Sequence, residues 1–144
     1  MKYLTIIFIA ALLIFTACGS DDVPQLDPNM PLNEQVDVLI SQNDYEAALA
    51  LLDGEDRDDP EVQILLEKTH LNYGLYSMNT FDATEMRTRM NNALTQFTEV
   101  LRINPQNSVA REQIVQIMDI YATIPDRSAD EDVIEGLREV GFDY

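Results

Sequence analysis

The chain is poor in the residues that build most metal and redox sites. Its 144 residues include one cysteine, one histidine and no tryptophan. A single cysteine cannot form an internal disulfide, and a single histidine cannot supply a cluster of imidazole ligands for zinc. Only five glycines are present, and they form no phosphate-binding loop or nucleophile elbow. We therefore expect no cofactor, no bound metal and no enzymatic activity.

Basic residues are also scarce, with 9 Lys and Arg against 26 Asp and Glu and a net charge of -17. An acidic surface repels the phosphate backbone, so the composition argues against binding to nucleic acid. Two interpretations of the acidity remain open. It can reflect a saline habitat, in which salt screens the self-repulsion, or a partner with a basic surface.

Residues 1–17 have the pattern of a secretion signal. Lys2 precedes an apolar run that ends at Phe15 and is followed by the small residues Thr16 and Ala17. A membrane-spanning helix needs about 20 apolar residues, whereas a shorter run that ends in small residues is typical of a cleaved signal. Lys2 is the only charged residue in this segment, so its removal would change the net charge from -17 to -18.

The only cysteine, Cys18, follows this apolar run directly. The sequence Phe15-Thr16-Ala17-Cys18-Gly19 resembles the lipobox of bacterial lipoproteins, although Phe15 stands where leucine is usual. The resemblance implies that Cys18 carries a diacylglycerol thioether, usually with an amide-linked acyl chain, and becomes the first mature residue. Two or three acyl chains anchor a protein stably, whereas one is marginal. We therefore expect a protein of the bacterial cell envelope, attached to the membrane through Cys18.

The residues after the cysteine indicate in which membrane the protein is located. In lipoproteins of the enterobacterial kind, an aspartate at that place retains the protein in the inner membrane, so Gly19 favours the outer membrane. Asp21-Asp22 fits either a signal for export to the cell surface or a solvated spacer, and the face of the membrane stays undetermined. Residues 18–30 contain two prolines and no apolar periodicity, which predicts a flexible tether.

A repeated pattern appears in the remaining residues, 31–144. A small residue, a large apolar residue four positions later and a proline eight positions after that occur twice, as A-x3-L-x7-P at 48–60 and A-x3-F-x7-P at 93–105. The pattern resembles the second helix of the tetratricopeptide repeat (TPR), a helix-turn-helix unit of about 34 residues. In that pattern the small residue admits the first helix closely, the large residue fills the space beside it, and the proline ends the helix.

Apolar residues at helical spacing support the same fold class. The sequence predicts an all-α domain, a short α-solenoid of about three TPR-like units. The second unit is lengthened around residues 78–89, where Asp82 could cap a helix, and the third is irregular. An unrelated small helical bundle is the alternative. Four apolar stripes carry the prediction: Leu32, Val36, Leu39 and Ile40; Val62, Leu65, Leu66, Thr69, Tyr73 and Tyr76; Met86, Met90, Ala93, Leu94, Phe97 and Leu101; and Ala110, Ile114, Ile117, Met118 and Tyr121.

Local signals set further expectations. His70 stands where the repeat wants a small residue, so either the two helices splay or the imidazole turns aside. Asn107 or Ser108 is expected to cap one helix, Ser128 to open the last one, and Gly141 to end it.

The function expected from this resemblance is that of a lipid-anchored adaptor or scaffold that binds another envelope protein or a basic peptide. In TPR proteins the first helices of the units line a groove. Two alternatives stay open: an envelope enzyme or small-ligand protein with a site of carboxylates and tyrosines such as Tyr73 and Tyr76, and an oligomeric structural subunit. The candidate groove residues are Asn33, Asp37, Glu67, Leu71, Glu112, Gln116 and Asp119.

Overall fold

The computed structural model describes residues 26–27, 29–80, 84–125 and 127–144, and every regular element within these ranges is a helix. The predicted all-α class is therefore confirmed. The secretion signal, Cys18 and Asp82 lie outside the described residues. The six helices are α1 (Leu32–Ser41), α2 (Tyr45–Leu52), α3 (Pro60–Asn79), α4 (Met86–Ile103), α5 (Ser108–Thr123) and α6 (Glu131–Glu139).

Polar side chains define several helix starts. Asp44 Oδ1 accepts from the amide of Ala47 (3.3 Å) at the start of α2, and Asn107 Oδ1 accepts from the amide of Ala110 (2.9 Å) at the start of α5. Such caps satisfy amides that have no partner within the helix. At the end of α6, Gly141 has a φ of 94°, which an L side chain rarely adopts. The predicted roles of Asn107 and Gly141 are thus confirmed.

The two prolines of the repeated pattern occupy different places. Pro105 follows α4 within the turn to α5, as predicted, whereas Pro60 is the first residue of α3. The expectation that Pro60 ends the preceding helix is wrong, because α2 already ends at Leu52. Proline suits the first helical position because its missing N–H would have no partner there, and Asp59 Oδ1 accepts from the amide of Glu61 (2.8 Å) beside it.

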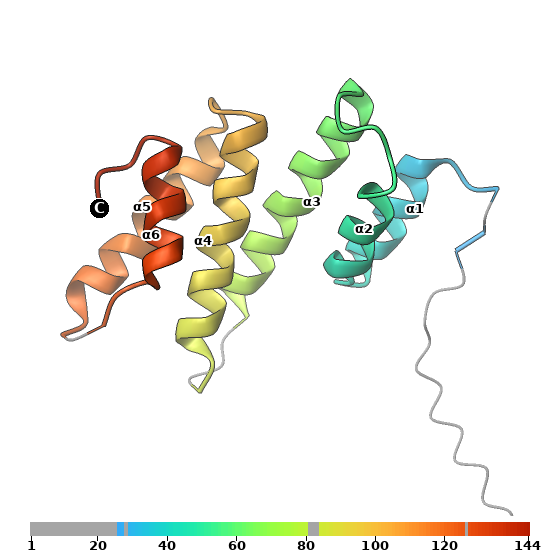
Figure 1. Cartoon of the computed structure of the whole chain (residues 1–144). Coiled ribbons are helices and arrows are strands. Elements are labelled where there is room, and N and C mark those ends of the chain that lie inside the picture. Colours follow the sequence, from blue (N-terminus) through green and yellow to red (C-terminus); the bar gives the residue numbers. More distant parts are fainter. Residues whose placement is uncertain (1–25, 28, 81–83, 126) are drawn as a thin grey trace, which may run out of the picture.

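The helices follow one another in a row from α1 and α2 at one end to α5 and α6 at the other, with α3 and α4 between them (Figure 1). Packing occurs between α1 and α2, α2 and α3, α3 and α4, and α4 and α5, and also between α1 and α3. The long hairpin of α3 and α4 therefore joins both ends of the molecule.

The interior consists of two apolar clusters on either side of α3. The smaller one includes Val36, Leu52 and Leu66, and the larger one is centred on Phe97 and Ile114. The small and large residues of both repeated patterns are fully buried: Ala48, Leu52, Ala93 and Phe97. The predicted stripes of α1, α4 and α5 all contribute to these clusters, whereas the α3 stripe holds only as far as Thr69, since Tyr73 is half-buried and Tyr76 exposed.

The close approach of α3 to α4 is made by Gly74 and not at position 70. A β-carbon at position 74 would come within 2.6 Å of Cε1 of Phe97, so the ring lies directly on the glycine backbone. The imidazole of His70 also reaches α4, and its Nδ1 lies 2.7 Å from Oε1 of Gln96. The two expectations for His70, splayed helices or an imidazole turned aside, stay predictions.

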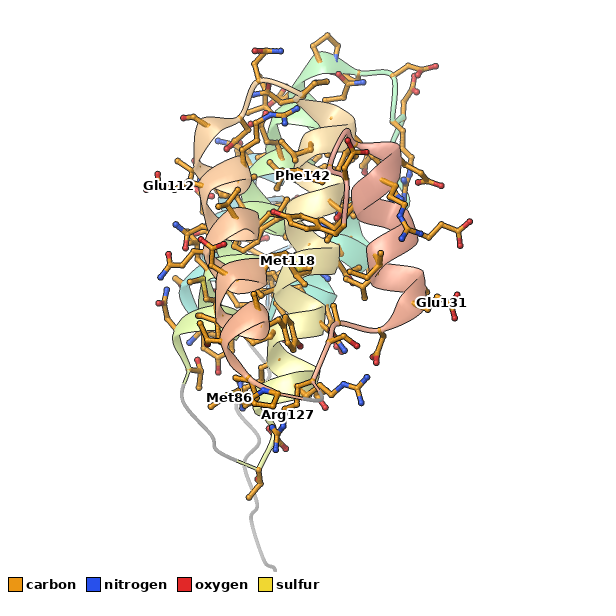
Figure 2. All side chains as sticks on the ribbon, turned by 90° about the vertical axis from the view of Figure 1, so that its left-hand side faces the viewer. Met86, Glu112, Met118, Arg127, Glu131 and Phe142 are labelled. Carbon is orange, nitrogen blue, oxygen red and sulfur yellow. The ribbon has the colours of Figure 1, made fainter. Side chains whose placement is uncertain are left out.

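The third pair of helices departs from the other two. α6 packs against α4, and Figure 2 shows α5 and α6 lying beside each other in front of α4, with Met118 and Phe142 between them. Within the described residues the backbones of α5 and α6 make at most marginal contact. The position of α6 is therefore set by its packing against α4 and not by contact with α5.

A polar cluster fixes the start of α6. Asn91, which is buried on α4, accepts through Oδ1 from the hydroxyl of Tyr121 (3.2 Å) and from the amide of Asp130 (3.3 Å). The Asp130 carboxylate bonds in turn to Asn91 and to Nη2 of Arg87 (2.6 Å). The helix therefore begins at Glu131, three residues later than the expected opening at Ser128.

Candidate binding surfaces

Helices α1, α3 and α5 are joined along one side by two polar connections. Asp37 of α1 pairs with Lys68 of α3. Glu67 Oε1 accepts from Nδ2 of Asn104 (2.9 Å) and from Nδ2 of Asn107 (2.8 Å), which ties α3 to the start of α5. The sequence-predicted groove residues all come from these three helices. We call this set the odd-helix face: Asn33, Asp37, Glu67, Leu71, Glu112, Gln116 and Asp119.

The members of the odd-helix face differ in what they can offer a partner. Glu67 and Leu71 are partly buried, and they serve the fold: Glu67 through its two asparagine donors, and Leu71 by packing against the larger core cluster. The other five are exposed. Asp37 is compensated by Lys68, so the negative charge available on this face is concentrated on α5.

On α5, Glu112 and Asp119 are exposed, and neither carboxylate forms an ion pair among the described residues. Figure 2 shows Glu112 on the outer side of the helix. Val109 and Val115 of the same helix are 42% and 43% exposed. The outer side of α5 therefore combines carboxylates with accessible apolar groups, a mixture that suits an amphipathic peptide with basic residues.

A second surface feature is an open hollow of about 200 Å³ where the turn between α1 and α2 meets α3. We call it the tyrosine hollow, and its lining residues are Asn43, Asp44, Tyr45, Glu46, Tyr73 and Tyr76. The rings of Tyr45 and Tyr73 are stacked, with centroids 5.0 Å apart and planes 8° apart. The centroid of the Tyr76 ring lies 5.4 Å from that of Tyr45, and the planes of these two rings are 46° apart.

Hydrogen bonds hold the tyrosine hollow in place. The Tyr45 hydroxyl donates to Oδ1 of Asn43 (3.1 Å), and the Tyr73 hydroxyl donates to Oε1 of Glu46 (3.3 Å). Burial raises the pKa of Tyr45 and of Tyr73, and the nearby Glu46 carboxylate raises the pKa of Tyr73 further. Both phenols therefore stay neutral at physiological pH, while the two carboxylates of the hollow supply negative charge.

The sequence singled out two of the three tyrosines but missed Tyr45. Tyr73 and Tyr76 are three residues apart on one helix, a spacing that indicates a shared side. Tyr45 is 28 residues earlier, so no local spacing links it to the other two. The signals beside it are local: Asn43 adopts a positive φ of 61°, which asparagine tolerates, and Asp44 caps α2, so Tyr45 is the first residue of that helix.

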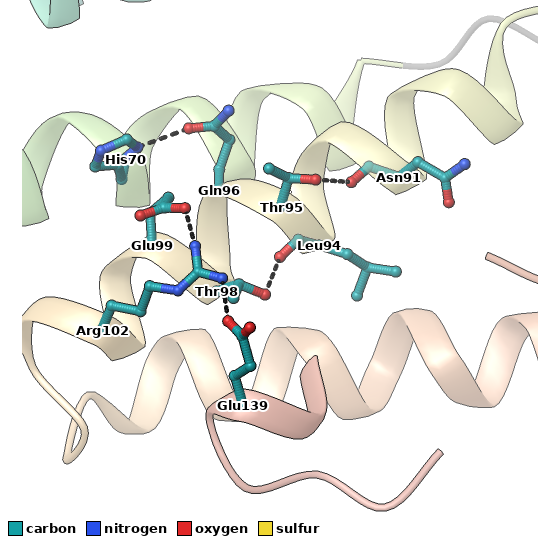
Figure 3. A network of polar contacts seen from close by, with 9 residues as sticks. All are labelled: His70, Asn91, Leu94, Thr95, Gln96, Thr98, Glu99, Arg102 and Glu139. Atoms are coloured by element: carbon teal, nitrogen blue, oxygen red, sulfur yellow. Dashed lines mark hydrogen bonds and ion pairs between the residues drawn. The ribbon is translucent and has the colours of Figure 1, made fainter. Parts of the chain in front are cut away.

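Two other features of the surface are a network of polar contacts and a small apolar crevice. Figure 3 shows a polar network in which Arg102 of α4 bonds to Glu99 and, at 2.7 Å, to Glu139 of α6, while His70 bonds to Gln96. These contacts link α4 to α3 and to α6. A small crevice of about 10 Å³ between α4 and α5 is lined mainly by apolar residues such as Met90 and Ile117.

No described residues gather three or more potential His, Cys, Asp or Glu ligands in one place. None of the helices in the described ranges is long and apolar enough to cross a membrane. No protein-family model, curated protein or solved structure matches the chain.

Proposed function

We propose that this protein is a lipid-anchored adaptor of the bacterial cell envelope, whose TPR-like helices bind a partner protein or peptide with basic residues. The observation that carries the proposal is the outer side of α5, where two uncompensated carboxylates, Glu112 and Asp119, accompany exposed valines. The anchor is Cys18, and the outer membrane is the favoured location because Gly19 follows it.

Support for the TPR-like arrangement comes from the first two helix pairs. In each, the small residue and the large residue of the repeated pattern are fully buried, and the second helix packs against the first helix of the next pair, α2 against α3 and α4 against α5. The first helices of the first two pairs, α1 and α3, also pack against each other. The third pair deviates, since α6 packs on α4, and a short array that ends with such a helix protects the end of its core.

Charge reversal on the odd-helix face tests the binding function. The variant protein, with Glu112→Lys and Asp119→Lys, is used to capture its partners from detergent-solubilised envelopes. We expect it to lose the basic partner, because the two new lysines repel the partner's basic residues. The effect should be a reduction of at least tenfold, since like charges across an interface cost several kcal/mol. Quantitative mass spectrometry of the captured proteins measures it.

The matched control is Glu55→Lys with Asp58→Lys. Both residues are exposed in the loop between α2 and α3, and the net charge changes by the same amount. The control should keep the partner. Equal capture by both variants, or equal loss from both, would mean that the α5 surface does not select the partner.

A further inference from the structure

The tyrosine hollow differs in chemistry from the α5 surface. Aromatic rings form its walls, carboxylates lie at its rim, and no basic side chain lines it. On α3, Tyr73 lies about 200° around the helix axis from Leu71 of the odd-helix face, at about 100° per residue. The hollow is therefore a separate candidate site.

The tyrosine rings provide surfaces that attract cations. The face of an aromatic ring carries partial negative charge, and a cation within about 6 Å of the ring centroid is stabilised by it. Tyr45 is 6% exposed and is held between its neighbours, whereas Tyr76 is 38% exposed and free to contact a ligand. The rigid packing of the trio means that little side-chain entropy is lost when a ligand binds.

The carboxylates complete the site. Asp44 uses Oδ1 to cap α2, and Glu46 uses Oε1 to accept from Tyr73, so each keeps one oxygen that has no hydrogen bond within the described residues. An ammonium or guanidinium group could bond to these oxygens while its apolar part contacts the rings. The phenols, which stay neutral, act as additional acceptors.

We propose that the tyrosine hollow is a binding site for an organic cation, an ammonium or guanidinium group, seated against Tyr76 and Tyr73 and charge-paired with Glu46. The cation can belong to a free small molecule or to a lysine or arginine side chain, and both sources share this chemistry. The proposal does not depend on the α5 surface, so either can fail while the other stands.

The test uses the mature protein, processed at Cys18, in a non-ionic detergent. The detergent has no choline or other cationic head groups. Of the six tyrosines, Tyr3 lies in the secretion signal, which leaves five to observe with fluorotyrosine labelling and 19F NMR. Tetramethylammonium chloride is one probe, and a blocked peptide with a single arginine is the other. Sodium chloride at the same concentration corrects for ionic strength.

We expect saturable shifts in the signals of Tyr45, Tyr73 and Tyr76, with little change at Tyr121 and Tyr144. Tyr76→Leu keeps apolar bulk but removes the ring, and it should weaken binding about tenfold. Tyr76→Phe keeps the ring and should bind nearly as the unmodified protein does. Glu46→Gln should also weaken binding, whereas Glu112→Gln should not. Tighter binding of the peptide would assign the site to a side chain, and tighter binding of tetramethylammonium to a free cation.

Three results would overturn the proposal: shifts that sodium chloride reproduces, equal affinities for Tyr76→Leu and Tyr76→Phe, or an equal loss from Glu46→Gln and Glu112→Gln. Equal affinities for the two Tyr76 variants would mean that the ring takes no part in binding. An equal loss from the two glutamine variants would mean that the cation responds to overall charge and not to the hollow. Tyr144→Leu serves as a control for folding and detergent effects, because Tyr144 is similarly exposed, at 40%, and lies at the opposite end of the row of helices.

Discussion

Phe97→Ala is expected to lower the free energy of unfolding by about 3 to 5 kcal/mol, the range for removing a fully buried aromatic ring. Phe97 has no exposed surface and lies at the centre of the larger core cluster. Small domains are stable by only about 5 to 15 kcal/mol, so this variant should be close to unfolding. Urea denaturation followed by circular dichroism measures the change.

The contact between Phe97 and Gly74 gives this prediction an internal check. Gly74→Ala alone should destabilise the fold by about 1 to 3 kcal/mol, because the new methyl group overlaps the ring. Introduced together with Phe97→Ala, the same change should be neutral or stabilising by up to about 1 kcal/mol, since alanine favours a helix over glycine. An equal cost in both backgrounds would contradict the described packing.

Phe142→Ala provides a matched control for the loss of a phenylalanine. Phe142 is only partly buried, and it packs at the edge of the same cluster after α6. Its replacement should cost less than half as much as Phe97→Ala. The reverse order would mean that the end of the chain, and not the α3–α4 contact, dominates the stability of the domain.

Cys18→Ser is expected to abolish lipid attachment completely. A serine hydroxyl cannot form the thioether, so the chain should carry no diacylglycerol and should not be cleaved before residue 18. Either the uncleaved precursor or a soluble product should accumulate. Mass spectrometry of the amino-terminal peptide, combined with membrane fractionation, separates these outcomes, because the precursor stays on the membrane through its apolar leader.

Gly19→Ser is the control for Cys18→Ser, since it changes the neighbouring residue and keeps the cysteine. It should give a processed, acylated product in the membrane fraction. A Cys18→Ser protein that is cleaved before residue 18 and still fractionates with membranes would contradict the lipid anchor. In that case another part of the chain would have to hold the protein at the membrane.

Helical periodicity and capping residues predicted much of the fold because their effects are local. The apolar stripes of α1, α4 and α5 become buried, and Asn107 and Gly141 bound their helices as expected. These signals depend on residues within a few positions of one another. The all-α class and most helix positions followed from them.

Long-range packing decided the features that the sequence did not reveal. Gly74 makes the close contact with α4, although the predicted repeat would have put a small residue at position 70, because the ring of Phe97 lies against position 74. Likewise, α6 packs on α4 because Asn91 holds Asp130, a contact between residues 39 apart. No local pattern encodes such pairings.

For the candidate site, too, the sequence indicated local features but not long-range contacts. The sequence named Glu112, Gln116 and Asp119 as groove residues, and the structure shows all three exposed on α5. Their place in a groove stays a prediction. Helix phase could not reveal that Glu67 accepts hydrogen bonds from Asn104 and Asn107. These two residues lie in the turn between α4 and α5, far from Glu67 in the sequence. The partner itself stays a prediction from charge and exposure.

The most direct test of the adaptor function is site-specific photo-crosslinking in living cells. A photoreactive residue replaces Gln116, which is exposed between Glu112 and Asp119 on α5, and a control chain carries it at Glu55. We expect a crosslinked envelope protein at position 116 that is absent at position 55 and is lost when Glu112 and Asp119 are changed to lysine. No adduct at position 116, or the same adduct at both positions, would contradict it.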